Sequence, residues 1–146
     1  DQLASIVAEV GGKIAYVKPH GALYHRVHHD PAQAEGLISA IREHDQNLLV
    51  MGMPEAVSLE VAQQGGLGTI LEGFADRGYG TDGLLIARDQ PDALIEIPDL
   101  AAEQALRLAP VVDSLCVHSD SPGALALMRR VRDVLETHSI VVGSGQ

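Results

Sequence analysis

Histidines, carboxylates and basic side chains gather in three short stretches of this sequence. They are Lys18 and His20 in the first stretch, Glu72, Asp76, Arg77 and Arg88 in the second, and His118 and Asp120 in the third. A histidine titrates near neutral pH, and a carboxylate can hold or orient a proton. Arginine and lysine bind carboxylates and stabilise negative charge that develops during a reaction. Together these side chains predict acid and base chemistry on a small polar substrate.

The individual roles follow from the side-chain types. His20 or Asp76 could move a proton or orient a water molecule, and Lys18 could stabilise developing negative charge. Arg77 or Arg88 could hold a substrate carboxylate with the two prongs of a guanidinium. A structural alternative stays open, in which Lys18 pairs with a neighbouring carboxylate and His20 caps a helix.

A divalent metal is a further alternative. His20, His118 and Asp120 are suitable ligand types, although the sequence contains no compact metal-binding motif. His25 and His29 have the i, i+4 spacing of two ligands on one helix. We favour a solvated surface for these two.

The first stretch has the pattern of a strand that ends in a tight turn before a helix. Ile14 to Val17 is an apolar run, and Pro19 biases Lys18 toward an extended conformation. Gly21 permits the positive backbone angle that starts a helix at Ala22. Lys18 and His20 are therefore expected at the C-terminal end of a strand, where parallel α/β folds bind ligands.

Strand and helix patterns alternate along the rest of the chain. Strands are predicted at 13–17, 48–51, 69–71, 111–117 and 140–142, and helices at 3–10, 22–29, 31–44, 54–65, 98–108 and 123–137. Asp30 is predicted to cap one helix, and Ser121 with Pro122 to start another. Residues 72–83 have no period and form a candidate active-site loop or lid, followed by short extended pieces at 84–88 and 92–97.

This alternation predicts an α/β fold with a parallel sheet, either open or closed. All three polar stretches follow predicted strands. We therefore expect them to converge on one rim of the sheet.

Composition limits the classes of function. The chain has 146 residues, a hydrophobic content of 46% and a formal net charge of −10, which fit one α/β domain over 1–146 and oppose binding to nucleic acid or an anionic membrane. No apolar run approaches the length of a membrane span. The one cysteine, Cys116, lies in an apolar run and is expected to be a buried thiol. A cytoplasmic location is the expectation.

Three ordered blocks of this sequence resemble the LamB/YcsF family. The first is the run from Val17 to Tyr24, which is similar to the family signature. The second comprises Glu72, the run from Phe74 to Tyr79, Asp82 with Gly83, and Arg88. The third runs from Ser114 to His118 and includes Asp120.

The resemblance implies parallel β/α units of a distorted β/α barrel of the glycoside hydrolase and deacetylase type. It also implies ATP-dependent opening of the lactam ring of 5-oxoproline to give glutamate, carried out with partner subunits B and C. ATP would act together with these subunits. The matched positions that it assigns to catalysis are Lys18, His20 and Asp76, and those that it assigns to substrate binding are Tyr24, Glu72, Arg77, Arg88, His118 and Asp120.

The sequence also departs from the family pattern. The family's Asp-Leu-Asn-x-Asp-x-Gly-Glu, Cys-Gly-Phe-His-Ala-Gly-Asp and His-Pro-Ser blocks do not occur, and His25 and Ser119 stand where asparagine and glycine are usual. We therefore expect the C-terminal part of an incomplete barrel, whose unpaired strand edges favour association with further copies. Two alternatives are an inactive remnant or interaction module, and a metal-dependent deacetylase-like hydrolase.

Overall fold

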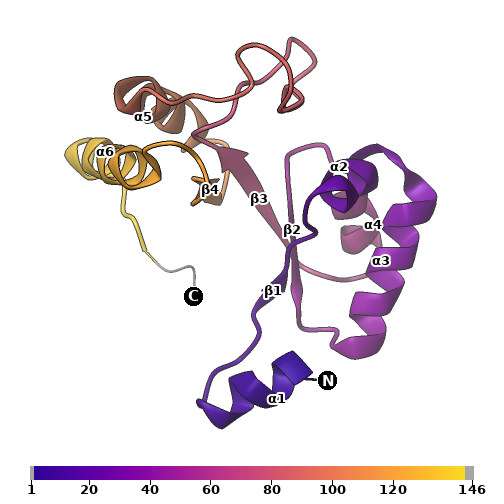
Figure 1. Cartoon of the computed structure of the whole chain (residues 1–146). Coiled ribbons are helices and arrows are strands. Elements are labelled where there is room, and N and C mark those ends of the chain that lie inside the picture. The colour runs from indigo at the N-terminus through magenta and orange to yellow at the C-terminus, as the bar shows by residue number, and fades with distance from the viewer. Residues whose placement is uncertain (1, 144–146) are drawn as a thin grey trace. The chain divides into compact units, whose positions relative to one another are not determined.

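The structure, a computed structural model, describes residues 2–143 (Figure 1). These residues form two compact units: the first ends at Leu71 and the second begins at Glu72. Strand β3 (Thr69–Phe74) contributes residues to both units. The expected single domain over 1–146 stays a prediction, and each unit is described by itself.

The first unit is a parallel α/β arrangement. Its strands are β1 (Tyr16–Val17), β2 (Leu49–Gly52) and the start of β3, with β2 pairing in parallel with both others. Its helices are α1 (Gln2–Glu9), α2 (Ala22–His29), α3 (Pro31–His44) and α4 (Val57–Gln64). The parallel pairing confirms the predicted fold class for this part of the chain.

Local sequence signals explain how the first unit folds. Gly21 has a φ of 56°, as the turn before α2 requires, and Pro19 is buried. The Asp30 carboxylate caps α3 by accepting the backbone N–H groups of Ala32 and Gln33, which confirms the predicted cap. Apolar residues of α3, β2, α4 and the connections beside them then form one core: Ile38, Ile41, Leu48, Val50, Ala56, Leu59, Ala62 and Leu67.

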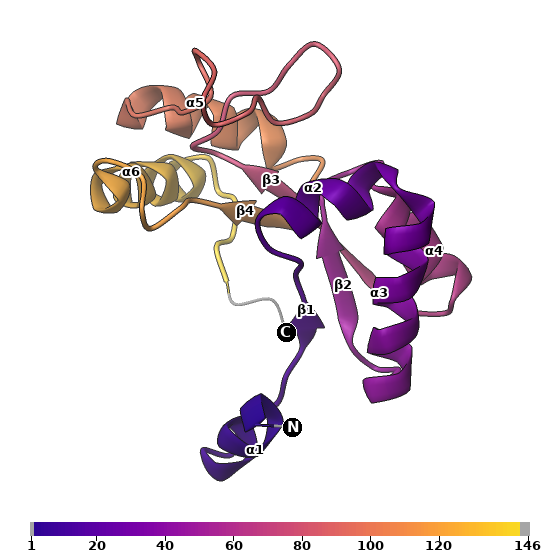
Figure 2. The same cartoon turned by 45° about the vertical axis from the view of Figure 1, so that its right-hand side comes forward.

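The second unit joins the end of β3 to β4 (Ser114–Cys116), again in parallel, with Glu72 opposite Ser114 and Phe74 opposite Cys116. Helices α5 (Pro98–Leu108) and α6 (Ala124–Thr137) pack against each other, as both Figure 1 and Figure 2 show. Their shared core comprises Ala75, Ala101, Ala105, Leu127, Val131 and Leu135. Ala75 belongs to this core, so the turn that follows β3 is anchored.

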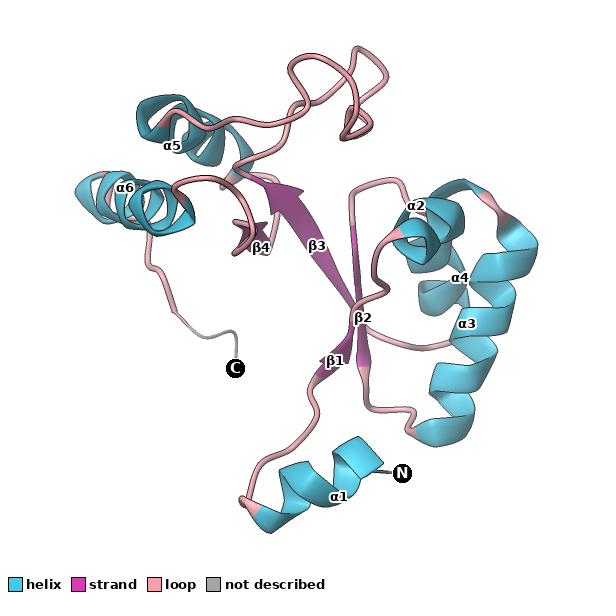
Figure 3. Cartoon of the chain, in the orientation of Figure 1, coloured by secondary structure: helices cyan, strands magenta, loops and turns pink. Residues whose placement is uncertain are grey.

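A long loop connects β3 to α5, and Figure 3 shows it free of helix and strand. The extended pieces predicted at 84–88 and 92–97 are reduced to isolated antiparallel bridges, Tyr79 with Leu85 and Arg77 with Leu94. The loop is nevertheless closely packed: a Cβ on Gly78 would collide with the carbonyl oxygen of Asp92.

Some predicted boundaries were wrong. The strand expected at 140–142 is absent, because the Ile140 N–H bonds the Leu135 carbonyl and closes the end of α6 instead. The helix expected from Pro54 begins at Val57, after Glu55, whose φ is 64°. Strand β4 starts only at Ser114, because the N–H groups of Val111 and Val112 bond the Leu108 carbonyl in a turn.

The helices within residues 2–143 are short or polar. None of them combines the length and the apolar character that a bilayer span needs.

Candidate functional site

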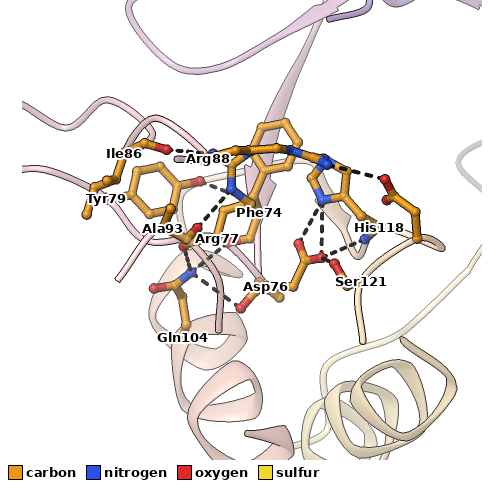
Figure 4. Close-up of polar contacts among 12 residues, drawn as sticks. Phe74, Asp76, Arg77, Tyr79, Ile86, Arg88, Ala93, Gln104, His118 and Ser121 are labelled. Atoms are coloured by element: carbon orange, nitrogen blue, oxygen red, sulfur yellow. Dashed lines mark hydrogen bonds and ion pairs between the residues drawn. The ribbon is translucent and has the colours of Figure 1, made fainter. Parts of the chain in front are cut away.

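The centre of the candidate site is the Asp76 carboxylate, which lies in the turn directly after β3 (Figure 4). Its exposed fraction is 0%. Oδ2 accepts hydrogen bonds from the His118 backbone N–H at 2.9 Å and from the Ser121 hydroxyl at 2.7 Å. The imidazole Nδ1 of His118 lies 3.0 Å from Oδ1. The loops after β3 and β4 therefore meet at one buried carboxylate.

These contacts set the protonation state of Asp76. Burial alone would raise the pKa of this carboxyl, but hydrogen bonds from the His118 ring, the Ser121 hydroxyl and the His118 backbone outweigh it and lower the pKa below the ordinary range. Asp76 is thus a carboxylate at neutral pH and can only accept hydrogen bonds. Nδ1 of His118 must then carry the proton that it donates to Asp76.

The orientation of His118 follows from that bond. With Nδ1 protonated, a neutral ring keeps its lone pair on Nε2, which lies on the other side of the ring from the carboxylate. The ring stacks on Phe74 with centroids 5.5 Å apart and planes 17° apart, and its side chain is 20% exposed. A fixed imidazole with an available Nε2 is the arrangement of a general base oriented by a carboxylate.

Two further side chains hold the backbone around Asp76. Gln104 of α5 donates from Nε2 to the carbonyl oxygens of Phe74 at 2.6 Å and Arg77 at 2.7 Å. The Tyr79 hydroxyl oxygen accepts the Phe74 N–H at 2.8 Å, and burial raises the pKa of this tyrosine. Neither role was foreseen from the sequence, because both depend on contacts with backbone groups that no side-chain pattern reveals.

Arg77 is buried and has a structural role, with an exposed fraction of 3%. Its Nε donates to the Ala93 carbonyl at 2.9 Å and its Nη2 to the Ile86 carbonyl at 2.6 Å. Burial, and next the nearby charge of Arg88, lower the pKa of this guanidinium. These bonds hold the long loop after β3 closed on itself, and the predicted role of Arg77 in substrate binding stays a prediction.

Arg88 and Asp120 form an exposed ion pair between the same two loops. Nη1 of Arg88 lies 3.2 Å from Oδ2 of Asp120, and the side chains are 52% and 70% exposed. The hydrogen bond from Arg88 and the nearby charges of Arg88 and His118 help to lower the pKa of Asp120. Both residues were predicted to bind substrate.

Ser121 corrects an expectation. We expected it to help start the last helix, but the N-cap of α6 is Gly123 and no side chain caps it. The Ser121 hydroxyl instead bonds Asp76. Glu72, another predicted site residue, is buried in β3 with an exposed fraction of 2%.

The remaining predicted residues belong to the first unit. His20 is exposed, whereas Lys18 is half-buried with Nζ 5.8 Å from the centroid of the buried Tyr24 ring, a cation–π distance. Nearby in α2, Nδ1 of His28 is buried without a hydrogen-bond partner, and burial lowers the pKa of that ring. The predicted convergence of these residues with those of the second unit stays a prediction.

The divalent metal alternative stays a prediction. Within residues 2–143 no three or more histidine, cysteine or acidic side chains are grouped so that they could hold a metal ion. His25 and His29 are both exposed. Cys116 is half-buried in β4.

The fold and the bonded pair of Asp76 and His118 define the chain as an α/β protein with a carboxylate-oriented histidine after its parallel strands. Comparison with known proteins is more specific. The sequence model of the LamB/YcsF family matches residues 1–145, and the chain belongs to this family.

Two relatives are A subunits of 5-oxoprolinase. The chain is 42% identical to the A subunit of 5-oxoprolinase from Streptomyces avermitilis over 92% of its own length and 59% of that protein. It is 38% identical to the A subunit of 5-oxoprolinase from Corynebacterium jeikeium, over 92% of its length and 57% of that protein. The chain thus spans a little under three fifths of the length of these relatives.

A solved structure agrees in fold. The lactam utilization protein from Thermus thermophilus has a TM-score of 0.84 and 32% identity, over 94% of this chain and 60% of that one. The expected fold class, parallel β/α units of a distorted β/α barrel, agrees with this likeness.

Proposed function

We propose that the chain acts in the hydrolysis of the lactam of 5-oxoproline to glutamate, as part of the A subunit of a 5-oxoprolinase. The names of its relatives support the assignment, since two are A subunits of 5-oxoprolinase and one is a lactam utilization protein. The word subunit implies further subunits, and we propose B and C as the partners. A cytoplasmic location is part of the same proposal.

The observation that carries the proposal is the hydrogen-bonded pair of Asp76 and His118. Hydrolysis adds water across the lactam bond: oxygen bonds to the carbonyl carbon, the bond to the ring nitrogen breaks, and that nitrogen gains a proton. Nε2 of His118 can take the proton from the attacking water and return it to the leaving nitrogen. Asp76 holds the ring in the required tautomer throughout.

Other residues enter the proposal with separate support. An unstrained amide resists attack by water, so we propose that ATP activates it in the complex with the partner subunits. The described residues do not offer a typical phosphate loop for ATP, since the glycine-rich run 65–68 precedes strand β3 instead of following a strand. No step is therefore assigned to ATP on this chain. The proposed catalytic roles of Lys18 and His20 rest on the family resemblance.

The test is glutamate release from 5-oxoproline by the natural polypeptide, purified and combined with its partner subunits and ATP. We expect His118→Gln to lower kcat by about 100-fold or more, as loss of a general base does. His138→Gln is the matched control, because His138 is exposed at the end of α6 and its ring bonds a backbone carbonyl of its own helix. An active His118→Gln enzyme with unchanged kcat contradicts the proposal.

A further inference from the structure

The ion pair of Arg88 and Asp120 joins the same two loops as the contact between Asp76 and His118. Arg88 belongs to the loop after β3, and Asp120 follows His118 by two residues in the loop after β4. Figure 4 shows the Arg88 side chain extending toward the His118 end of the network. The contact therefore spans the two loops that position the imidazole.

The ion pair of Arg88 and Asp120 can open, whereas the neighbouring guanidinium of Arg77 is held in place. Arg77 is fixed by two carbonyl oxygens, whereas the side chains of Arg88 and Asp120 are 52% and 70% exposed and meet at one pair of atoms. An exposed, single-point ion pair contributes little to stability. A guanidinium has five N–H donors in a fork, and the contact with Asp120 is made by Nη1 alone.

The charge around the ion pair of Arg88 and Asp120 differs from the charge of the whole chain. The chain has a formal net charge of −10, which repels an anionic ligand in general. Arg88 lies within electrostatic range of Arg77, so two cations share this side of the site. When no ligand is bound, Asp120 neutralises one of them. A ligand carboxylate that accepts two parallel bonds from the guanidinium is a better acceptor than Asp120 in its present single-point contact.

We propose that Arg88 is the receptor for the carboxylate of the ligand and that Asp120 is its built-in competitor, which the ligand carboxylate displaces on binding. The proposal rests on the proposed function for the identity of the ligand, 5-oxoproline, which carries a carboxylate beside its lactam. Displacement places the ligand next to His118 and ties occupancy of the site to opening of the ion pair. It also selects lactams that carry a carboxylate over those that do not.

The experiment compares the dissociation constants of three probes for the natural polypeptide: 5-oxoproline, 2-pyrrolidinone, which has the lactam without the carboxylate, and acetate, which has the carboxylate without the lactam. Binding is followed by NMR through the ring signals of His118 and, in the proteins that keep Arg88, also through its Nε–H signal. Arg88→Gln should weaken 5-oxoproline and acetate by about 10-fold or more, since bonds between charged groups are lost. Its effect on 2-pyrrolidinone should be negligible.

Asp120→Asn should act in the opposite direction and tighten 5-oxoproline and acetate by about two- to fivefold, the range that removal of an exposed ion-pair partner allows. The matched controls come from the exposed pair of Arg130 and Asp99, whose Nε and Oδ1 lie 2.6 Å apart. Arg130→Gln and Asp99→Asn change the net charge by the same amounts without touching the site. Neither should alter binding of any probe.

The outcomes separate this inference from the proposed function. If Asp120→Asn tightens no carboxylate more than Asp99→Asn does, or if Arg88→Gln leaves carboxylate binding unchanged, the inference is wrong even when lactams bind. If acetate responds to both variants but neither lactam binds, the carboxylate receptor stands and the proposed substrate is wrong.

Discussion

The two units place polar side chains after parallel strands in different ways. In the first unit His20 is exposed and Lys18 is half-buried beside an aromatic ring. In the second unit Asp76 is fully buried and bonds both His118 and Ser121. The polar side chains of the second unit are therefore preorganised, because the fold maintains their geometry without a ligand. Side chains of the first kind can serve a reaction while contributing little to folding.

The strongest test of this contrast is the stability of Asp76→Asn against that of Lys18→Met. An amide at position 76 cannot accept all the hydrogen bonds that the carboxylate accepts, and a buried donor is left unsatisfied. We expect the free energy of unfolding to fall by about 2–4 kcal/mol. Lys18→Met should lower it by less than about 1 kcal/mol, the value of a partly exposed cation–π contact. Urea denaturation measures the free energy of unfolding of both variants. Equal losses of stability would contradict the contrast between the two units.

The two neighbouring arginines provide a second comparison within one unit. Arg77→Gln removes buried bonds to the Ala93 and Ile86 carbonyls and should lower the free energy of unfolding by about 2–3 kcal/mol. Hydrogen exchange should accelerate at the Gly78 and Ile86 amides, whose bonds close the loop. Arg88→Gln is the control and should cost about 0–1 kcal/mol. A stable Arg77→Gln variant with a protected loop contradicts the structural role of Arg77.

Two glycine substitutions extend the comparison to the backbone. Gly78→Ala sets a methyl group against the Asp92 carbonyl, so we expect a loss of about 1–3 kcal/mol from forced backbone movement. Gly36→Ala in α3 meets nothing within 4 Å and should stabilise the protein by about 0.5–1 kcal/mol, because alanine favours a helix. Thermal unfolding should show a lower melting temperature for Gly78→Ala and a higher one for Gly36→Ala. An unchanged melting temperature of Gly78→Ala would mean that the loop is not closely packed.

The smallest predicted effect is a dependence of stability on pH. The pKa of Asp76 is lowered in the fold, whereas the pKa of an unfolded aspartate is about 3.9. Its stabilisation is therefore complete above that pH and is lost as the pH falls through the folded pKa. Below about pH 4 the wild type should lose stability more steeply than Asp76→Asn. Acid titrations of unfolding followed by circular dichroism measure the difference, and parallel curves would contradict it.

Much of the fold could be predicted because its signals are local. Asp30 before Pro31 specified the start of α3, and the order Lys18, Pro19, His20, Gly21 specified a strand, a turn and a helix. The end of β3 was missed, because the charged Glu72 and the flexible Gly73 are unusual in a strand. Pairing with β4 overrides that tendency, and a Cβ at Gly73 would lie 3.1 Å from a side-chain atom of Leu108 and 3.3 Å from one of Val112.

The candidate site likewise contains residues that the sequence predicts and residues that it does not. Their positions after predicted strands singled out Asp76 and His118, which are 42 residues apart in the sequence and hydrogen-bonded in the fold. It could not assign the hydroxyl of Ser121 or the amide of Gln104, since these depend on long-range geometry and not on spacing. The apolar run 140–142 has the composition of a strand, yet Ile140 packs against the core of α5 and α6 at a helix end.

The tautomer of His118, read from its ring nitrogen chemical shifts in a long-range nitrogen NMR spectrum, tests whether Asp76 prepares the ring to act as a base. We expect a proton on Nδ1, an unprotonated Nε2, and a change in the Nε2 shift when 5-oxoproline is added. In Asp76→Asn the Nδ1–H preference should be lost. A proton on Nε2 in the wild type, with no response to 5-oxoproline, would contradict the claim that Asp76 prepares His118 to act as a base.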